Sequence, residues 1–287
     1  MAVLTGNERR PTNSMPHRAR AQNMARAGRW TIVALAVAWT LAPLLPLVPW
    51  SLSAGWRWPD LLPERWSGRA WAYLVSPGAQ ALPALLTSLA LAAAVTLLAL
   101  AAGLPAALAL GQRRFRGRAL VELLVFAPIL TPPLTVAMGL QVVFVRLGLA
   151  DTAPGVLLVH LVFAVPYVVL ILASACAALG PEWEQQARSL GASPWRAFWH
   201  VTLPLLRPAL AVAALLAFLV SWSQYALTLL IGGGAVFTLP LLVFAVARGS
   251  DPALAAAAAL LFVAPTIIFL ALAARNLAER DGGLGVL

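Results

Sequence analysis

Residues 152–181 read TAPGVLLVHLVFAVPYVVLILASACAALGP, thirty consecutive positions without a charged side chain. A helix of about 20 apolar residues spans the hydrocarbon core of a bilayer, so this run is long enough for one crossing. Five other uncharged runs of at least 23 residues flank it, at 30–56, 70–112, 123–145, 208–247 and 252–274. Since each run can hold one span, the sequence predicts an all-α, polytopic membrane protein with six transmembrane helices.

The composition excludes several other classes of protein. Of the 287 residues, 61% are hydrophobic and only 10% are charged, and the mean hydropathy is +0.86. A soluble domain carries about 25% charged residues, and an outer-membrane barrel would show short alternating strands. The single Cys176 cannot form an intramolecular disulfide, and the histidines His17, His160 and His200 are far apart in sequence. We therefore expect no metal site, no cofactor in this chain and no nucleic-acid partner.

The arginines predict which way the chain crosses the membrane. All 20 basic residues are Arg, and fifteen of them lie in the leader 1–29, in the loops 111–118 and 179–208, and from Arg275 onward. Cytosolic loops of membrane proteins are rich in Arg and Lys, so both termini are predicted to be cytosolic. Residues 1–29 read as a disordered basic leader, and 30–50 as the first span. A cleaved signal peptide is the alternative, although its apolar stretch is usually only about 7–15 residues long.

Proline and glycine divide the longer runs. Ser76-Pro77-Gly78 separates an external connector, 51–79, from the core at 80–275, and the tail follows at 276–287. The glycines 232–234 leave 235–247 too short to cross the membrane, which predicts a re-entrant or interfacial segment. Prolines in the third span should kink or open that helix. The connector carries aromatic residues typical of a membrane interface, namely Trp50, Trp56, Trp58, Trp66, Trp71 and Tyr73.

The span interiors offer no energy source for transport. Gln141 and His160 are the strongly polar groups deep in the third and fourth spans, and no GxxxxGK[ST] loop or hydrolase motif occurs. For His160 a hydrogen-bonded packing role and a proton or ligand role both stay open. We therefore expect that the chain is not an enzyme, and that any transport is driven by another subunit.

The loop 179–208 is the longest polar interruption between spans, and its sequence predicts a folded elbow. Pro181, Glu182 and Glu184 suit the first turn of a helix that ends near Gly191. Ser193 and Pro194 then suit the start of a second short helix, with an aromatic face of Trp195, Phe198 and Trp199 and an end at Pro204 and Pro208. Such a face can dock into a partner, or it can pack on its own helices or on the lipid interface.

The stretch from Glu184 to Pro204, EQQARSLGASPWRAFWHVTLP, resembles the EAA loop of binding-protein-dependent ABC importer permeases. The family pattern is Glu-Ala-Ala, three residues, Gly, nine residues, an aliphatic residue, one residue and Leu-Pro. The positions that match are Ala187, Gly191, Val201, Leu203 and Pro204. Gln185 and Gln186 replace the first two residues of the triplet, and Glu184 lies one position early.

This resemblance implies a type I importer permease of a bacterial inner membrane, with the core 80–275 containing the EAA-like loop 182–204. It implies two ATPase subunits, a second permease subunit that is a paralogue or an identical copy, and a periplasmic or lipid-anchored solute-binding protein. Gly191 would keep the turn, and Arg188 and Arg196 would pair with the ATPase or with anionic lipid. The ATPase-coupling residues implied are Glu184, Ala187, Arg188, Gly191, Ala192, Ser193, Trp195, Phe198 and Pro204.

The fifth span supplies the candidate pathway residues Ser221, Gln224, Tyr225 and Thr228. Their surroundings, and the form Ser189-Leu-Gly-Ala-Ser193, look most like the branch that moves polyamines, thiamine, iron or oxyanions, and the resemblance favours a polyamine-like solute. Polar residues in a membrane helix also bond neighbouring helices, so a packing role is equally open. The alternative function is a channel, a facilitator or a membrane scaffold without ATPase coupling.

Overall fold

The computed structural model describes residues 28, 31–33, 35–39, 41–56 and 63–281, with side chains as far as residue 271. The chain divides into two compact units, residues 1–49 and 50–287. In the first unit, the 3-10 helix η1 (Ala42–Leu44) and the start of α2 (Leu47–Ser51) end a candidate membrane span, Thr31–Ser51. The predicted leader lies outside the described residues except for Gly28, and the last six residues of the predicted tail lie outside them as well.

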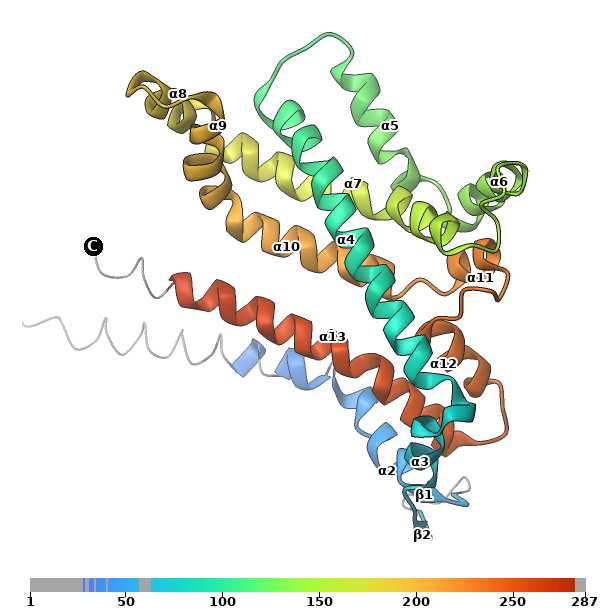
Figure 1. Cartoon of the computed structure of the whole chain (residues 1–287). Coiled ribbons are helices and arrows are strands. Elements are labelled where there is room, and N and C mark those ends of the chain that lie inside the picture. The colour runs from blue at the N-terminus through green and yellow to red at the C-terminus, as the bar shows by residue number, and fades with distance from the viewer. Residues whose placement is uncertain (1–27, 29–30, 34, 40, 57–62, 282–287) are drawn as a thin grey trace, which may run out of the picture. The chain divides into compact units, whose positions relative to one another are not determined.

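Among its described residues, the second unit is helical apart from one pair of two-residue strands (Figure 1). Strands β1 (Ser53–Ala54) and β2 (Arg65–Trp66) pair antiparallel. The helices that follow are α3 (Arg69–Val75), the 3-10 helix η2 (Pro77–Ala79), α4 (Ala81–Gln112), α5 (Arg118–Leu130), α6 (Pro133–Arg146), α7 (Ala153–Leu179), α8 (Glu182–Ser189), α9 (Pro194–Ala197), the π-helical turn η3 (Phe198–Thr202), α10 (Leu203–Trp222), α11 (Ala226–Gly232), α12 (Leu239–Ala247) and α13 (Pro252–Asp281).

Within the described residues, five helices are long and apolar enough to cross a membrane: Thr31–Ser51, α4, α7, the continuous stretch Pro194–Trp222, and α13 as far as Ala271. The pair α5 and α6 also passes this test when taken together, which gives six. The two helices meet at an angle of 106°. The break falls at Thr131 and Pro132, where proline prevents the helix from continuing. The structure confirms an all-α, multi-span fold, and the predicted kink in the third span is a sharp bend.

Helices α4, α7 and α10 pack together around small and β-branched residues. Val95, Ala99 and Ala107 of α4 lie against Val168 and Leu172 of α7, all fully buried. Without a hydrophobic effect between helices in lipid, close packing of this kind is what holds membrane helices together. This contact joins α7, which precedes the elbow, to α10, which follows it.

One sequence prediction is wrong: Pro204 and Pro208 do not end the second helix of the elbow. The chain stays helical from Pro194 through η3 to Trp222. Pro204 lies in the first turn of α10, and Pro208 lies inside α10. The π-helical turn directly before Pro204 changes the hydrogen-bond spacing there, which lets the missing N–H groups be tolerated. The elbow is therefore joined rigidly to the fifth span.

Candidate coupling surface and pathway residues

The turn of the elbow is formed by the C-terminal cap of α8. Leu190 is the C-cap of α8, and Gly191 follows with a φ of +91°. The Gly191 N–H donates to the Arg188 carbonyl at 3.0 Å, and the Ala192 N–H donates to the Ala187 carbonyl at 3.1 Å. These two bonds form a Schellman motif, which satisfies carbonyls that would otherwise lack partners at the helix end. The sharp turn therefore depends on the positive φ of Gly191.

The second arm of the elbow starts at a side-chain cap. Ser193 has an extended backbone, and its Oγ accepts a hydrogen bond from the Arg196 N–H at 3.3 Å. Pro194 occupies the first turn, where its missing N–H costs nothing. These contacts confirm that α9 begins where the sequence predicts. They fix the direction in which the aromatic residues that follow leave the elbow.

Three aromatic side chains form a cluster on this arm, which we call the aromatic ridge: Trp195, Phe198 and Trp199. The ring centroids of Trp195 and Trp199 are 5.5 Å apart, and those of Phe198 and Trp199 are 5.6 Å apart. Trp195 is nevertheless 69% exposed and Trp199 46% exposed. Close by in sequence, Trp183 and Leu190 are also exposed. The chain's own helices therefore leave much of this apolar surface uncovered.

The remaining predicted coupling residues have distinct surroundings. Glu184 is half-buried and Arg188 is exposed. Neither takes part in the two ion pairs found among the described residues, Arg69–Asp251 and Arg118–Glu122. Figure 1 shows α8 and α9 together at the end of α7, so the structure brings the predicted coupling residues into one segment.

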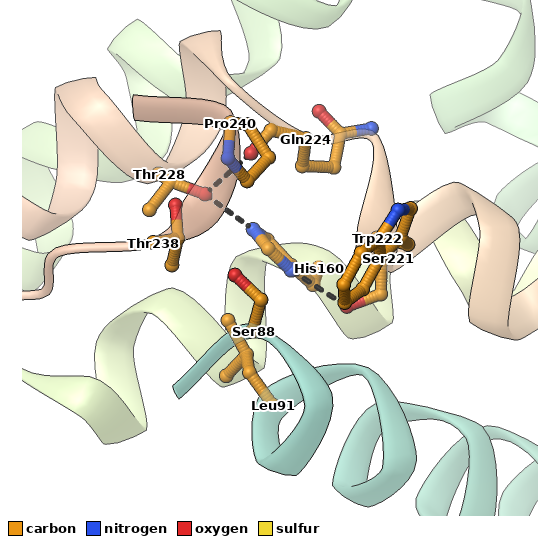
Figure 2. A pocket seen from close by; sticks show the side chains of 9 residues that line it. All are labelled: Ser88, Leu91, His160, Ser221, Trp222, Gln224, Thr228, Thr238 and Pro240. Atoms are coloured by element: carbon orange, nitrogen blue, oxygen red, sulfur yellow. Dashed lines mark hydrogen bonds between the residues drawn. The ribbon is translucent and has the colours of Figure 1, made fainter. Parts of the chain in front are cut away.

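The predicted pathway residues lie around a break between α10 and α11, at residues 223–225. There the imidazole of His160, on α7, lies between two hydroxyl groups (Figure 2). Its Nδ1 is 2.9 Å from Ser221 Oγ, and its Nε2 is 3.0 Å from Thr228 Oγ1. All three residues are almost fully buried. The structure thus gives His160 two hydrogen bonds and places it beside two predicted pathway residues.

A narrow cavity borders this group, and it is too small to hold a water molecule. Gln224 and Thr228 line it together with two residues that the sequence analysis did not single out, Ser88 and Thr238. Ser88 Oγ accepts from the Leu239 N–H at 2.8 Å. The hydroxyl of Thr238 is buried and has no hydrogen-bond partner among the described residues. The available signal for Ser88 was that it is the one serine in the apolar stretch 81–112.

Tyr225 does not line this cavity. Its ring packs on Phe244 of α12 at 4.1 Å between centroids, and the guanidinium of Arg248 lies over the Phe244 ring at 4.4 Å. Tyr225 instead lines an open, mostly apolar hollow of about 450 Å³ with Gln141 of α6. The structure therefore brings Ser221, Gln224 and Thr228 together, and it places Tyr225 at a separate surface.

These features define a class of protein: a helical, multi-span membrane protein with a structured polar elbow, a break between two apolar helices and uncharged polar groups beside that break. Residues 103–280 match the family model of the binding-protein-dependent transport system inner membrane component, and the chain belongs to this family. The predicted resemblance to ABC importer permeases is thus confirmed.

Two curated relatives and one solved structure extend this result. The molybdenum transport system permease protein ModB of Mycobacterium tuberculosis is 33% identical over 250 residues, covering 82% of this chain and 89% of that protein. The putrescine transport system permease protein PotI of Escherichia coli is 32% identical over 257 residues, covering 83% and 88%. A bacterial ABC transporter that imports the acidic polysaccharide alginate has the same fold, with a TM-score of 0.66, 19% identity and coverage of 93% and 99%.

The chain is therefore a multi-pass permease subunit of the inner membrane that works with a binding protein, and it is not itself an enzyme. The relatives are named for different solutes, so family membership does not single out a polyamine.

Proposed function

We propose that this chain is the permease subunit of an importer that moves a small solute inward, and that separate ATPase subunits drive it through the elbow at 182–204. The observation that carries this proposal is the exposed aromatic ridge on a rigid arm. Trp195 stays 69% exposed although it stacks on its neighbours, and the arm continues without a break into α10. A partner that covers the ridge can therefore move the fifth span as a rigid body.

The proposed assembly contains two ATPase subunits, a second permease subunit and a solute-binding protein on the external side. Both termini lie in the cytosol, because fifteen of the 20 arginines then face it. This orientation places the elbow on the side where ATP is available. It also places the ion pair of Arg69 with Asp251, at 2.8 Å, on the side that receives the binding protein.

A polyamine-like solute is the first substrate to test, because the putrescine permease of Escherichia coli is 32% identical over most of this chain. A molybdenum oxyanion is the second, because the mycobacterial relative is 33% identical. The cavity beside His160 is lined by hydroxyl, amide and imidazole groups without a carboxylate or an Arg. Such a lining does not select by charge, so we assign the choice of solute to the binding protein.

The elbow can be tested with a glycine pair that has the same backbone strain. Gly191 has a φ of +91° and Gly117, in the loop before α5, has a φ of +87°, and a Cβ at either position meets open space. Gly191→Asp and Gly117→Asp should therefore cost similar strain. If the elbow couples to the ATPase, Gly191→Asp abolishes solute-stimulated ATP hydrolysis by the reconstituted complex, and Gly117→Asp keeps it.

Co-purification with the products of neighbouring genes supplies the second readout. The proposal expects an ATPase subunit that is retained by the Gly117→Asp variant and lost or inactive in the Gly191→Asp variant. Recovery of the wild-type chain with no nucleotide-binding partner after gentle extraction would favour a channel or scaffold. Equal stimulation of ATP hydrolysis in both variants would remove the coupling role from the elbow.

A further inference from the structure

The short helix α11 is held by polar contacts at both of its ends. At the C-terminal end, the Gln141 side-chain amide of α6 donates to the Leu230 carbonyl at 3.2 Å. The Asp151 N–H donates to the Ile231 carbonyl at 2.7 Å. At the N-terminal end, Thr228 contacts His160 of α7. The position of α11 is therefore set by hydrogen bonds from α6, from the loop after α6, and from α7.

The hydrogen bonds at the N-terminal end run in one direction. The Thr228 hydroxyl is 2.8 Å from the Gln224 carbonyl, which can only accept, so the hydroxyl donates its single proton there. Thr228 Oγ1 must then accept from His160 Nε2–H, and this leaves Nδ1 to accept from the Ser221 hydroxyl. The neutral Nε2–H tautomer thus satisfies every group, and the chain of bonds runs from Ser221 to the Gln224 carbonyl.

This chain of bonds bridges the break between α10 and α11. Ser221 is in the last turn of α10, the Gln224 carbonyl lies inside the break, and Thr228 is in α11. A backbone group freed by a helix break costs several kcal/mol in a bilayer unless protein or water satisfies it. The cavity beside the break has no room for water, so the Thr228 hydroxyl that His160 holds supplies the bond.

We propose that His160 is a positioning residue of the transport pathway. Its two ring nitrogens hold Ser221 and Thr228, and with them the break, in the closed arrangement of this structure. When the imidazole separates from either hydroxyl, α11 is released and the side chain of Gln224, which is half-buried here, becomes more accessible from the pathway. This inference rests on the proposed function, because it assigns to His160 the control of the residues proposed to line the path.

Two other roles for His160 do not fit its surroundings. A metal ion needs a free ring nitrogen, and both nitrogens here are bonded to hydroxyls. The described residues also contain no group of three His, Cys, Asp or Glu side chains able to hold a metal. A proton relay needs a titratable neighbour, and no carboxylate lines the adjacent cavity.

The test measures thiol accessibility at the break in the assembled complex. Cys176 is first replaced by Ala, and Gln224→Cys is then introduced as the reporter. The reporter keeps the backbone carbonyl that Thr228 bonds, so the bridge itself is intact. Labelling rates with a membrane-impermeant maleimide are compared for His160, His160→Leu, His160→Gln and Thr228→Val. Leu and Val keep approximate volume without hydrogen bonds, whereas the Gln amide can still donate to Thr228.

We expect His160→Leu and Thr228→Val each to raise the labelling rate at least about tenfold, which corresponds to about 1.4 kcal/mol. His160→Gln should stay within about threefold of the parent, because it restores the bond to Thr228. Equal labelling of the parent and both apolar variants would overturn the inference. So would a Gln variant that is as reactive as the Leu variant, because side-chain volume would then explain the effect.

The same preparations separate this inference from the function on which it rests. Solute-stimulated ATP hydrolysis of the parent complex reports on the import proposal, and labelling of Gln224→Cys reports on His160. Suppose that the parent complex hydrolyses ATP in response to solute, and that the variants show no labelling difference. The import proposal would then be supported, and the proposed role of His160 would be wrong. If His160→Leu fails to assemble, Thr228→Val gives the decisive comparison, because it leaves the imidazole in place.

Discussion

Gly111 lies where α4 meets α7 near the elbow, and replacing it with Ala should force the two helices apart. A Cβ at this position would lie 2.7 Å from the Ala173 carbonyl oxygen and 2.7 Å from the Cys176 Cβ. The carbonyl belongs to the backbone of α7 and cannot rotate away. Ordinary van der Waals contact begins at 3.4 Å, so the helices must separate by several tenths of an ångström.

The matched control is Gly139, a helical glycine of α6 whose added Cβ would meet nothing within 4 Å. Ala is favoured over Gly in a helix by about 1 kcal/mol at both positions. That gain cancels in the comparison, and what remains is the cost of overpacking, about 1–3 kcal/mol. Gly111→Ala should therefore be less stable than Gly139→Ala by that amount.

The assay is the thermal midpoint of the detergent-solubilised chain, followed by size-exclusion chromatography after heating. A difference of 1 kcal/mol moves the midpoint by about 2–4 °C in a chain of 150–250 residues, so a difference of about 1–3 kcal/mol should separate the two variants by roughly 2–12 °C. Gly103→Ala should also be costly, because its added Cβ would lie 2.6 Å from a methyl group and 3.2 Å from the Cβ of Val168. Val168 is fully buried, and a β-branched side chain in a helix strongly prefers one χ1 rotamer, so it cannot easily turn away.

Equal midpoints for the Gly111 and Gly139 variants would refute the reasoning. They would mean that α4 and α7 do not approach this closely in the folded protein. A second sign would appear in function, because Gln112 follows Gly111 and its amide donates to the Gly180 carbonyl at 3.2 Å. Separation of the helices should lengthen that bond and lower solute-stimulated ATP hydrolysis in the Gly111 variant alone.

Four further variants test separate contacts. Gln112→Leu removes the bond from α4 to Gly180, directly before the elbow, and should lower the ratio of stimulated to basal ATP hydrolysis without loss of assembly; an unchanged ratio would contradict this. Asp251→Ala removes both the N-terminal cap of α13, at 3.1 Å from the Ala253 N–H, and the ion pair with Arg69, and should cost about 1–2 kcal/mol in thermal stability. Arg69→Ala should cost less than about 1 kcal/mol, since its side chain is 58% exposed, and a larger loss than for Asp251→Ala would reverse the assignment. Ser193→Ala removes the cap of α9 and should reduce ATPase binding to the aromatic ridge with little change in the midpoint.

The sequence predicts the local features of this protein well. The end of α8 at Leu190, the positive φ of Gly191 and the cap at Ser193 all occur where the residue types indicate. Each depends on a few neighbouring residues, so tertiary structure is not needed to recognise it. The break near Pro132 can also be predicted locally, because proline lacks the N–H that would continue the helix in the adjacent turn.

The features that the sequence does not predict depend on an irregular helical turn or on contacts between residues far apart in the chain. Pro204 suggests a helix end, but the π-helical turn before it keeps the chain helical. The bonds of His160 join residues 61 and 68 positions apart, so only the packing of α7 against α10 and α11 brings them together. Ser88 and the Leu239 N–H are 151 positions apart. No periodicity in the sequence indicates such pairs.

Few polar groups lie in the spans, so the hydrogen-bond partners of each one are informative. Gln141 bonds the Leu230 carbonyl, and His160 bonds Ser221 and Thr228, so these groups hold α11 in place. Beside the same cavity, the buried Thr238 hydroxyl has no hydrogen-bond partner among the described residues. A buried polar group without a partner is costly in a membrane, and it persists where another state of the protein uses it. We therefore infer that the Thr238 hydroxyl finds its partner when α11 moves, which is the step that the elbow would drive.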